Sequence, residues 1–149
     1  MTEIIFSDEY FMRRALEEAR DASAKGEVPV GAVVVSANRI IARAHNLTET
    51  LNDVTAHAEM LAITAAAETL GGKYLSNCTL YVTLEPCLMC AGAMAWAQLG
   101  RLVSGAADSK RGFSNYHPLP IHPKTEWIQG VLADECERLV KEFFKNKRR

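Results

Sequence analysis

The chain has 149 residues, of which 48% are hydrophobic and 23% are charged, and its formal net charge is -1 at pH 7. This composition is that of an ordinary soluble domain and argues against disorder, while the charge total neither favours nor excludes a nucleic-acid partner. No run of about 18 apolar residues and no basic opening followed by an apolar stretch occurs, which argues against a membrane span and a secretion signal. We therefore expect one cytoplasmic domain over residues 1–149, whose four cysteines serve metal binding or catalysis rather than disulfide bonds.

The first predicted element is a helix over residues 8–25. Apolar residues recur there at spacings of three and four, Ser7 is a suitable N-cap, and Gly26 stands where a C′ glycine is expected. Two short strands, at 32–35 and 39–44, follow and are joined by a turn.

The middle of the chain alternates helix and strand. After a polar loop, Thr55 is a suitable cap for a helix over 56–70, which a glycine pair ends. Residues 79–84 form the third predicted strand. Pro86 fits the first position of a helix over 86–99, because proline needs no N–H partner there.

A fourth strand is predicted at 102–106, a fifth at 125–131 and a last helix at 134–145. Residues 108–124 are irregular and contain three prolines, and connections of this length are usually functional or mobile. Because strands alternate with helices, the predicted fold class is α/β: a three-layer α/β/α sandwich with helices on both faces of a five-stranded mixed sheet.

Three residues with metal-binding side chains stand in two short clusters. His57 lies in His-Ala-Glu, and Cys87 and Cys90 lie in Pro-Cys-Leu-Met-Cys at a predicted helix start. Cysteines three apart in a first helical turn share one face, and free N–H groups favour their thiolates there. Catalytic zinc sites keep three protein ligands and leave one position for water. The sequence thus predicts a catalytic zinc site with Glu59 as its acid and base.

The position of Glu59 raises a geometric question. Residues two apart on an ideal helix point in nearly opposite directions, so His57 and Glu59 would not face the same ion. They converge only if the first turn is frayed or if Glu59 reaches around the helix, and the sequence leaves both open.

Each cluster alone also has a simpler interpretation. A CxxC pair is typical of thioredoxin-like redox sites, and His-x-Glu occurs often by chance. A redox pair normally follows the first strand of a βαβ unit, whereas this one follows the third predicted strand. In this order, the two clusters match the His-x-Glu and Pro-Cys-x-x-Cys signature of zinc deaminases. Cys78 and Cys136 lack such partners, and we expect both to be small buried hydrophobic residues.

Longer stretches around these clusters resemble the bacterial tRNA-specific adenosine deaminases, a branch of the zinc-dependent cytidine deaminase superfamily. The matching stretches are FSDEYFMR at 6–13, EVPVGAV at 27–33, TAHAE at 55–59, TLYVTLEPCLMCAGAM at 79–94 and GVLADEC at 130–136, with Asp108 and the Phe-Phe-Lys at 143–145. The resemblance covers nearly the whole chain. It departs at His45, where an aromatic indole is common, at Ala107, and over 112–124.

The resemblance implies a homodimeric hydrolase that converts the wobble adenosine of a tRNA anticodon to inosine by zinc-hydroxide deamination. It implies one zinc ion per subunit on His57, Cys87 and Cys90, with proton transfer by Glu59. The expected partner is a tRNA anticodon stem-loop, and no membrane is involved.

Five residues are predicted to bind the substrate: Asn46, Asp108, Lys110, Phe144 and Arg148. Asn46 matches the family position that hydrogen-bonds the flipped base, although a turn-forming loop asparagine fits the sequence as well. Lys110 and Arg148 suit phosphate contacts, although basic residues near a helix end are usually solvated. Phe144 suits stacking on a base, although it also fits a core-facing position.

Two other functions remain open on the same scaffold. One is a deaminase of a free nucleobase or nucleoside, such as guanine, cytosine or adenosine, and the basic C-terminus favours RNA over it. The other is a structural zinc domain or an inactive scaffold partner, against which Glu59 argues because a scaffold needs no acid and base.

Overall fold

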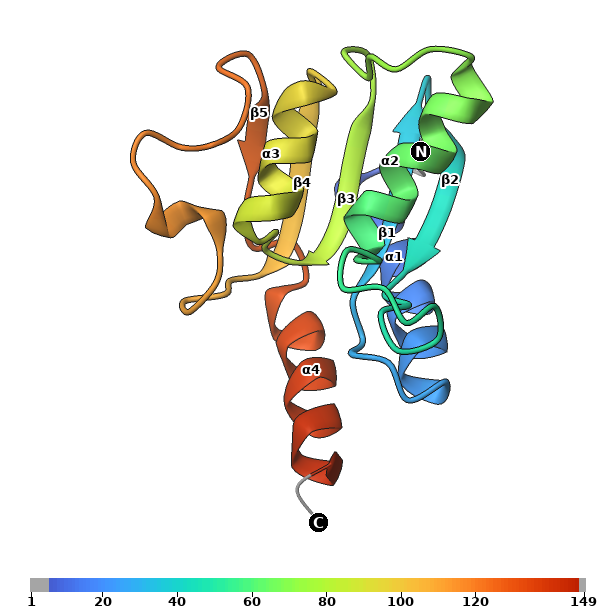
Figure 1. The fold of residues 1–149 in the computed structure, drawn as a ribbon, viewed down its shortest axis with the longest axis vertical. Helices are drawn as coiled ribbons and strands as arrows, with labels where there is room; N and C mark the ends of the chain where they lie inside the picture. The colour runs from blue at the N-terminus through green and yellow to red at the C-terminus, as the bar shows by residue number, and fades with distance from the viewer. Residues whose placement is uncertain (1–5, 148–149) are drawn as a thin grey trace, which may run out of the picture.

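The computed structural model describes residues 6–147 and confirms the predicted α/β/α sandwich (Figure 1). Its elements are α1 (Asp8–Ala24), β1 (Gly31–Ser36), β2 (Arg39–His45), α2 (Ala58–Leu70), β3 (Thr79–Leu84), α3 (Leu88–Trp96), β4 (Arg101–Ala106), the short 3-10 helix η1 (Phe113–Asn115), β5 (Glu126–Ile128) and α4 (Ala133–Lys147). No helix in this described range is long and apolar enough to cross a membrane.

The five strands form one mixed sheet in the order β2-β1-β3-β4-β5. β1 is antiparallel to β2 and β3, whereas β3, β4 and β5 are parallel to one another. The pairing therefore changes from antiparallel to parallel at β3. In open α/β sheets, ligands bind outside the carboxyl ends of strands where the order of the sheet changes, and α3 starts just after that end of β3.

Each face of the sheet is covered by two helices. Ala32 and Val34 of β1 pack with α2 and α3, whereas the alternate residues Val33 and Val35 pack with α1 and α4. Side chains of a strand alternate between faces, so β1 is apolar throughout because both of its faces are buried. In Figure 1, α2 and α3 lie in front of the sheet and α1 lies behind it.

The first helix begins and ends as predicted. The Ser7 side chain accepts a hydrogen bond from the Tyr10 N–H at 3.1 Å, which makes Ser7 the N-cap of α1. Gly26 has a φ of 79°, the left-handed conformation that a glycine just beyond a helix adopts.

The starts of α2 and α3 correct the prediction. α2 begins at Ala58 rather than at residue 56, and Thr55 does not cap it, because the Thr55 hydroxyl and N–H both donate to the Asp53 carboxylate. α3 begins at Leu88, two residues after Pro86. The Pro86 carbonyl accepts from the Phe113 N–H, and this long-range bond keeps the chain extended before the helix.

Two element ends also differ. α3 stops at Trp96 rather than at residue 99, because Gln98 turns the chain with a φ of 54°. β5 stops at Ile128, since the next bond to β4 joins the Val131 N–H to the Ser104 carbonyl outside the register of the ladder.

An ion pair joins the start of α1 to the start of β4. Arg101 donates to both carboxylate oxygens of Asp8 at 2.8 Å, and the Tyr81 hydroxyl also donates to Asp8 at 2.8 Å. Both charged side chains are 30% exposed. Through its hydrogen bonds, Arg101 holds the pKa of the Asp8 carboxyl below its usual value of 3.8.

Replacing Asp8 by Asn should lower the free energy of unfolding by about 1 kcal/mol, because Arg101 loses a bidentate, partly buried partner. A carboxyl with a lowered folded-state pKa stabilises the fold above its unfolded pKa, and this contribution is lost as the pH falls through the lowered value. Urea unfolding should therefore separate the two proteins near neutral pH and bring them together below pH 3.8.

Glu17→Gln is the matched control, because it breaks the exposed pair between Arg14 and Glu17. It should cost less than half as much as Asp8→Asn. Equal losses for the two variants would contradict the role given to Asp8.

Candidate metal centre and active site

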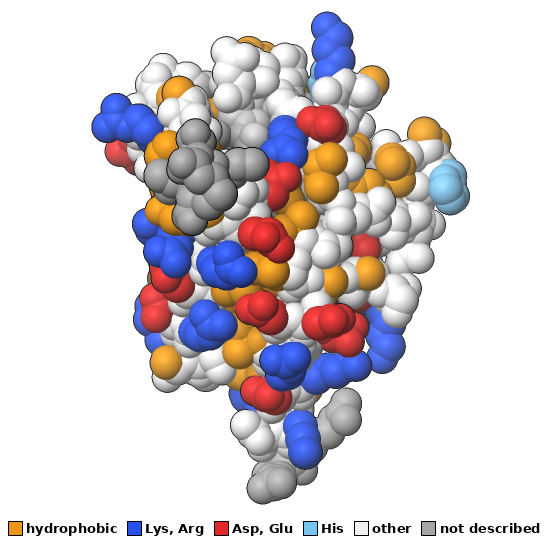
Figure 2. Space-filling view, turned by 180° about the vertical axis from the view of Figure 1, so that it is seen from behind, with side chains coloured by type: hydrophobic (Ala, Val, Ile, Leu, Met, Phe, Trp, Pro, Cys, Tyr) orange, Lys and Arg blue, Asp and Glu red, His pale blue; other side chains and the backbone are white. Residues whose placement is uncertain are grey.

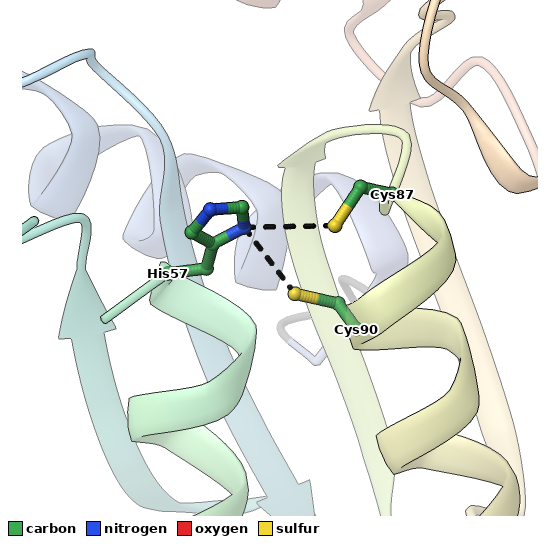
Figure 3. Close-up of side chains that lie close together, drawn as sticks. All are labelled: His57, Cys87 and Cys90. Carbon is green, nitrogen blue, oxygen red and sulfur yellow. Dashed lines mark hydrogen bonds between the residues drawn. The ribbon is translucent and has the colours of Figure 1, made fainter. Parts of the chain in front are cut away.

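Three ligand atoms from two helix starts converge at one point beside the sheet (Figure 3). The Nδ1 atom of His57 lies 3.6 Å from the Cys87 Sγ and 3.5 Å from the Cys90 Sγ. All three atoms lie within 4.8 Å of one another, and no other group of this kind occurs within residues 6–147. The structure thus brings together the three residues that the sequence predicted as ligands.

The two helix starts explain how the ligands converge. His57 is the N-cap of α2 and Cys87 is the N-cap of α3, and both have extended backbone conformations. The backbone of an N-cap residue is not helical, so the direction of its side chain does not follow the rotation from one helical residue to the next. His57 therefore stands outside the helix that holds Glu59, which answers the geometric question raised by the sequence.

The spacing of the donors fits zinc. Zinc bonds of about 2.1 Å to nitrogen and about 2.3 Å to sulfur, meeting at a tetrahedral angle, place the two atoms about 3.6 Å apart. The distances from His57 to the two sulfurs agree with this value. One histidine and two cysteines leave the fourth position of a tetrahedral ion to a water or a substrate, which is the ligand count of a catalytic site.

The local electrostatics favour a thiolate at Cys87. Hydrogen bonds from Cys90 and His57 lower the pKa of the Cys87 thiol to about 4, even though burial opposes this. In return, the hydrogen bond to Cys87 raises the pKa of His57. The hydrogen bond with Cys87 and burial raise the pKa of the Cys90 thiol. At neutral pH one thiolate is therefore already present to bind a cation.

Glu59 is the second residue of α2 and is 4% exposed. Burial raises the pKa of the Glu59 carboxyl to about 7. A nearby cation favours the carboxylate and works against this effect of burial. A buried carboxyl next to a cation is therefore of the kind that serves as a general acid and base.

A cavity of about 250 Å³ lies over the ligands. Its lining residues are Val28, Val30, Asn46, Thr48, His57, Ala58, Glu59, Leu84, Glu85, Cys87, Asp108 and Arg111. Asn46 is 7% exposed, and its side-chain Oδ1 is buried without a hydrogen-bond partner among the described residues. A buried amide oxygen without a partner costs free energy, so it indicates that a ligand completes the site.

Two buried carboxylates hold the loops around this cavity. Glu27 accepts from the N–H groups of Glu49 and Thr50 and from the Thr50 hydroxyl. Burial alone would raise the pKa of Glu27, but the hydrogen bonds from Thr50 and Glu49 hold it below its usual value. Glu27 thereby anchors the loop that leads to His57.

Glu85 anchors the loop on the other side. Its two carboxylate oxygens accept from the N–H groups of Asp108 and Ser114. Glu85 is 5% exposed and stands two residues before Cys87. Because loop and ligand share this short segment, the loop from Asp108 to Ser114 has a fixed position relative to the metal centre.

The predicted substrate-binding residues do not all share this cavity. Asn46 and Asp108 line it, although the Asp108 Oδ1 already accepts from the N–H groups of Lys110 and Arg111. Lys110 lies in a neighbouring groove. Phe144 is a half-exposed residue of α4 outside the cavity lining, with its ring against Phe143. Arg148 lies outside the described residues.

The sequence groups Arg111 with Lys110, Phe113 and Tyr116 as a basic and aromatic mixture suited to RNA contact. It does not predict that Arg111 lines the cavity beside the metal ligands, which the structure shows. The position of Arg111 next to Lys110 was the available signal. His45, where the chain departs from the resemblance, does not line the cavity. Its ring lies between Glu18, 2.8 Å from Nδ1, and Lys25, 3.0 Å from Nε2. The prediction that Cys78 and Cys136 are buried is confirmed, and burial raises the pKa of both thiols.

Comparisons with known proteins agree with this geometry. Residues 6–106 match the family described as the cytidine and deoxycytidylate deaminase zinc-binding region. The tRNA-specific adenosine deaminase of Aquifex aeolicus is 45% identical over 145 residues, which cover 94% of this chain and 95% of that protein.

Two solved structures are also similar. One, from work on A-to-I editing by tRNA:A34 deaminases at the wobble position of transfer RNA, has a TM-score of 0.82 and 44% identity, covering 87% of this chain and 98% of that one. A guanine deaminase from Nitrosomonas europaea has a TM-score of 0.80 but 25% identity, covering 92% of this chain and 84% of that one. The fold is shared with both, and the sequence is closer to the first.

Cys87→Ala should reduce the zinc content of the purified protein from about one ion per chain to near zero, because two ligands hold zinc far more weakly than three. The melting temperature should fall as well, since metal binding is linked to folding. Elemental analysis and a melting curve measure the two effects.

Cys78→Ala is the matched control, because Cys78 is a buried cysteine that belongs to the core rather than to the ligand group. It should keep its zinc. Full zinc content in Cys87→Ala, or equal loss in both variants, would contradict the assignment of the ligands.

Proposed function

The chain belongs to the tRNA-specific adenosine deaminases, within the zinc-binding cytidine and deoxycytidylate deaminase family, and we propose that it converts the wobble adenosine of a tRNA anticodon to inosine. The observation that carries this function is the His57, Cys87 and Cys90 group beside a buried Glu59, in a cavity that Asn46 also lines. The net reaction consumes one water and releases one ammonia at C6 of adenine. We take residues 1–149 as one deaminase domain, since a single sheet supports both ligand-bearing helices.

The residues of this chain divide the reaction between them. His57, Cys87 and Cys90 would hold one zinc ion. When bound, this ion would lower the pKa of a water, so that the water can lose a proton and attack at neutral pH. Glu59 accepts a proton from the attacking water and donates it to the ring nitrogen next to C6. Glu59 then takes the second proton from the hydroxyl now bonded to C6 and passes it to the amine, which leaves as ammonia as the C6 carbonyl forms. The burial of Glu59, and its pKa of about 7, support both roles.

Asn46 is the residue that we assign to the base. Its unpartnered Oδ1 can accept a hydrogen bond from a donor on the base, and its amide can donate one. Val28, Val30 and Leu84 supply apolar surface for the ring in the same cavity. An adenosine must leave the stack to enter this cavity, and a base in a loop leaves at a smaller cost than a base in a duplex.

RNA contact is proposed for the side of the molecule that carries the cavity. Lys110 is exposed beside it, and we assign to Lys110 and Arg148 contacts with phosphates and to Phe144 contact with a base. Over α1 and α4, acidic and basic side chains are interspersed (Figure 2), so that face is a poorer candidate for phosphate contacts, and Phe144 of α4 is assigned to a base instead. A phosphate backbone binds best where basic groups stand without acidic neighbours.

We further propose that the enzyme is a cytoplasmic homodimer. Trp96 at the end of α3 is 86% exposed and Val54 before α2 is 85% exposed. Large apolar side chains this exposed are of the kind that a second copy covers.

A deaminase of free guanine is the second candidate, because the Nitrosomonas europaea enzyme has nearly the same fold. The difference in identity, 25% against 44% for the structure from the tRNA study, favours the tRNA substrate.

The wild-type protein should deaminate an anticodon stem-loop far faster than free adenosine, guanine or cytidine, because its rim adds contacts that a free base cannot make. Glu59→Gln should lower that rate by at least about a thousandfold, since the amide cannot exchange protons. Its zinc content and melting temperature should remain those of the wild type, because Glu59 is no ligand.

Inosine formation, elemental analysis and melting curves measure these three quantities. Turnover of free guanine in preference to the stem-loop would assign the second function. Loss of zinc in Glu59→Gln would instead make Glu59 a ligand.

Asn46→Ala and Lys110→Gln should separate chemistry from binding. Asn46→Ala should slow the single-turnover rate at saturating stem-loop, because it loses a hydrogen bond to the reacting base. Lys110→Gln should keep that rate but weaken binding, and it should reduce the slope of log affinity against log salt by about 0.7, the value for one single-strand phosphate contact. An unchanged salt slope in Lys110→Gln would contradict its phosphate contact.

A further inference from the structure

The residue before Asn46 is held from the opposite face of the sheet. His45 ends β2, which lies at the edge of the sheet beside β1. The His45 Nδ1 atom lies 2.8 Å from the Glu18 Oε1 of α1, and the His45 Nε2 atom lies 3.0 Å from the Lys25 Nζ, at the end of α1. One imidazole ring therefore joins the end of the edge strand to two points of the first helix.

The two partners define the state of this ring. A carboxylate only accepts hydrogen bonds and an ammonium group only donates them. A neutral ring with its proton on Nδ1 makes both bonds at once, donating to Glu18 and accepting from Lys25, and so has one orientation. The side chains of His45 and Glu18 are 12% and 17% exposed, so water competes less for their bond than for a bond at the surface.

The close approach of α1 to this strand end depends on Gly31. Gly31 is the partner of His45 in the ladder between β1 and β2. A Cβ on Gly31 would collide with the Ala15 carbonyl oxygen and would stand 2.8 Å from the Glu18 Cβ. Only glycine therefore lets α1 lie against the sheet at this point, and this packing brings the Glu18 carboxylate within reach of the His45 ring.

The strand connects this contact to the reacting cavity. Side chains alternate between the two faces of a strand, so Ala44 packs with the core beside α2, whereas His45 points to α1. Asn46 then lines the cavity, and its N–H donates to the Val30 carbonyl at 3.1 Å. Because β2 has a neighbouring strand on one side, the His45 ring resists rotation of its end. It thereby fixes the direction in which the Asn46 side chain leaves the backbone.

We propose that His45 is a positioning residue for the reaction: held by Glu18 and Lys25, it keeps the Asn46 amide aimed at the base. This inference rests on the proposed function, in which Asn46 contacts the reacting base. His45 does not line the cavity, so it acts only through Asn46. A hydrogen bond weakens steeply when its angle is poor, so a small rotation of the strand end is enough to weaken the bond to the base.

A second contact between the same two elements supplies the control. Arg43, two residues earlier on β2, lies 4.0 Å from Glu17 of α1, and both side chains are about half exposed. This contact also joins β2 to α1, but it does not adjoin Asn46. Removing it should therefore leave the reaction unchanged.

The test is a cycle of two substitutions in the zinc-loaded protein, with an anticodon stem-loop as substrate. His45→Ala should lower the single-turnover rate at saturating stem-loop by about tenfold, the effect of one poorly aligned hydrogen bond to the base, with the affinity for the stem-loop nearly unchanged. In the Asn46→Ala protein, His45→Ala should change the rate by less than about twofold, because two changes that act through one contact are not additive.

Two further variants complete the test. His45→Asn, whose amide can donate to Glu18 from near the position of Nδ1, should keep most of the rate. Arg43→Ala should keep all of it. Equal losses from His45→Ala with and without Asn46 would overturn the positioning role, as would an equal loss in Arg43→Ala.

Glu18→Ala tests the same contact from α1 and should show the same lack of additivity with Asn46→Ala, which decides the matter if His45→Ala does not fold. If the wild type turns over a free base instead of the stem-loop, the proposed function fails. The same cycle with that base then decides the role of His45 separately.

Discussion

Two helix starts that are distant in the sequence must bring their ligand atoms close enough to share one ion, 3.5 to 3.6 Å from the His57 nitrogen to the two sulfurs, and this requirement governs the arrangement around the sheet. His57 and Cys87 both act as N-caps, and extended conformations at these two positions turn their side chains towards a common point. The free N–H groups of both helices and their positive ends face that point. Lowering of the Cys87 pKa by Cys90 and His57 follows from the same proximity.

Buried carboxylates hold this arrangement in place. Glu27 fixes the loop before His57, and Glu85 fixes the loop after β4, each through backbone N–H groups. A buried charge is tolerated when such donors satisfy it, and removal of the donors would leave it at a cost of several kcal/mol. Unlike these satisfied carboxylates, the Asn46 Oδ1 is buried without a partner among the described residues, and it lies where a substrate would supply a donor.

Local patterns made most of the fold and the metal ligands predictable. Apolar periodicity placed α1 and Ser7 capped it as expected, because these signals depend on neighbours in the sequence. The starts of α2 and α3 were not predictable in this way, since Asp53 captures Thr55 and the loop after β4 holds Pro86. The sequence marks Arg111 as part of a basic and aromatic mixture, but it does not predict that this residue lines the cavity. That position is set by the contacts of its loop with Glu85, which no local pattern reveals.

The loop after β4 is fixed to the segment that carries Cys87. Gly112 forms an isolated bridge with Cys87, and a Cβ on Gly112 would stand 2.1 Å from the Glu85 Oε2, so only glycine permits this contact. Over residues 112–124 the sequence departs from the resemblance described in the sequence analysis. This stretch presents Tyr116, whose N–H donates to the carbonyl of the buried Phe113. Residues past this bridge can therefore differ in sequence without displacing Cys87. The fixed contact at Gly112 separates the part of the loop that borders the candidate ligands from the part that carries Tyr116.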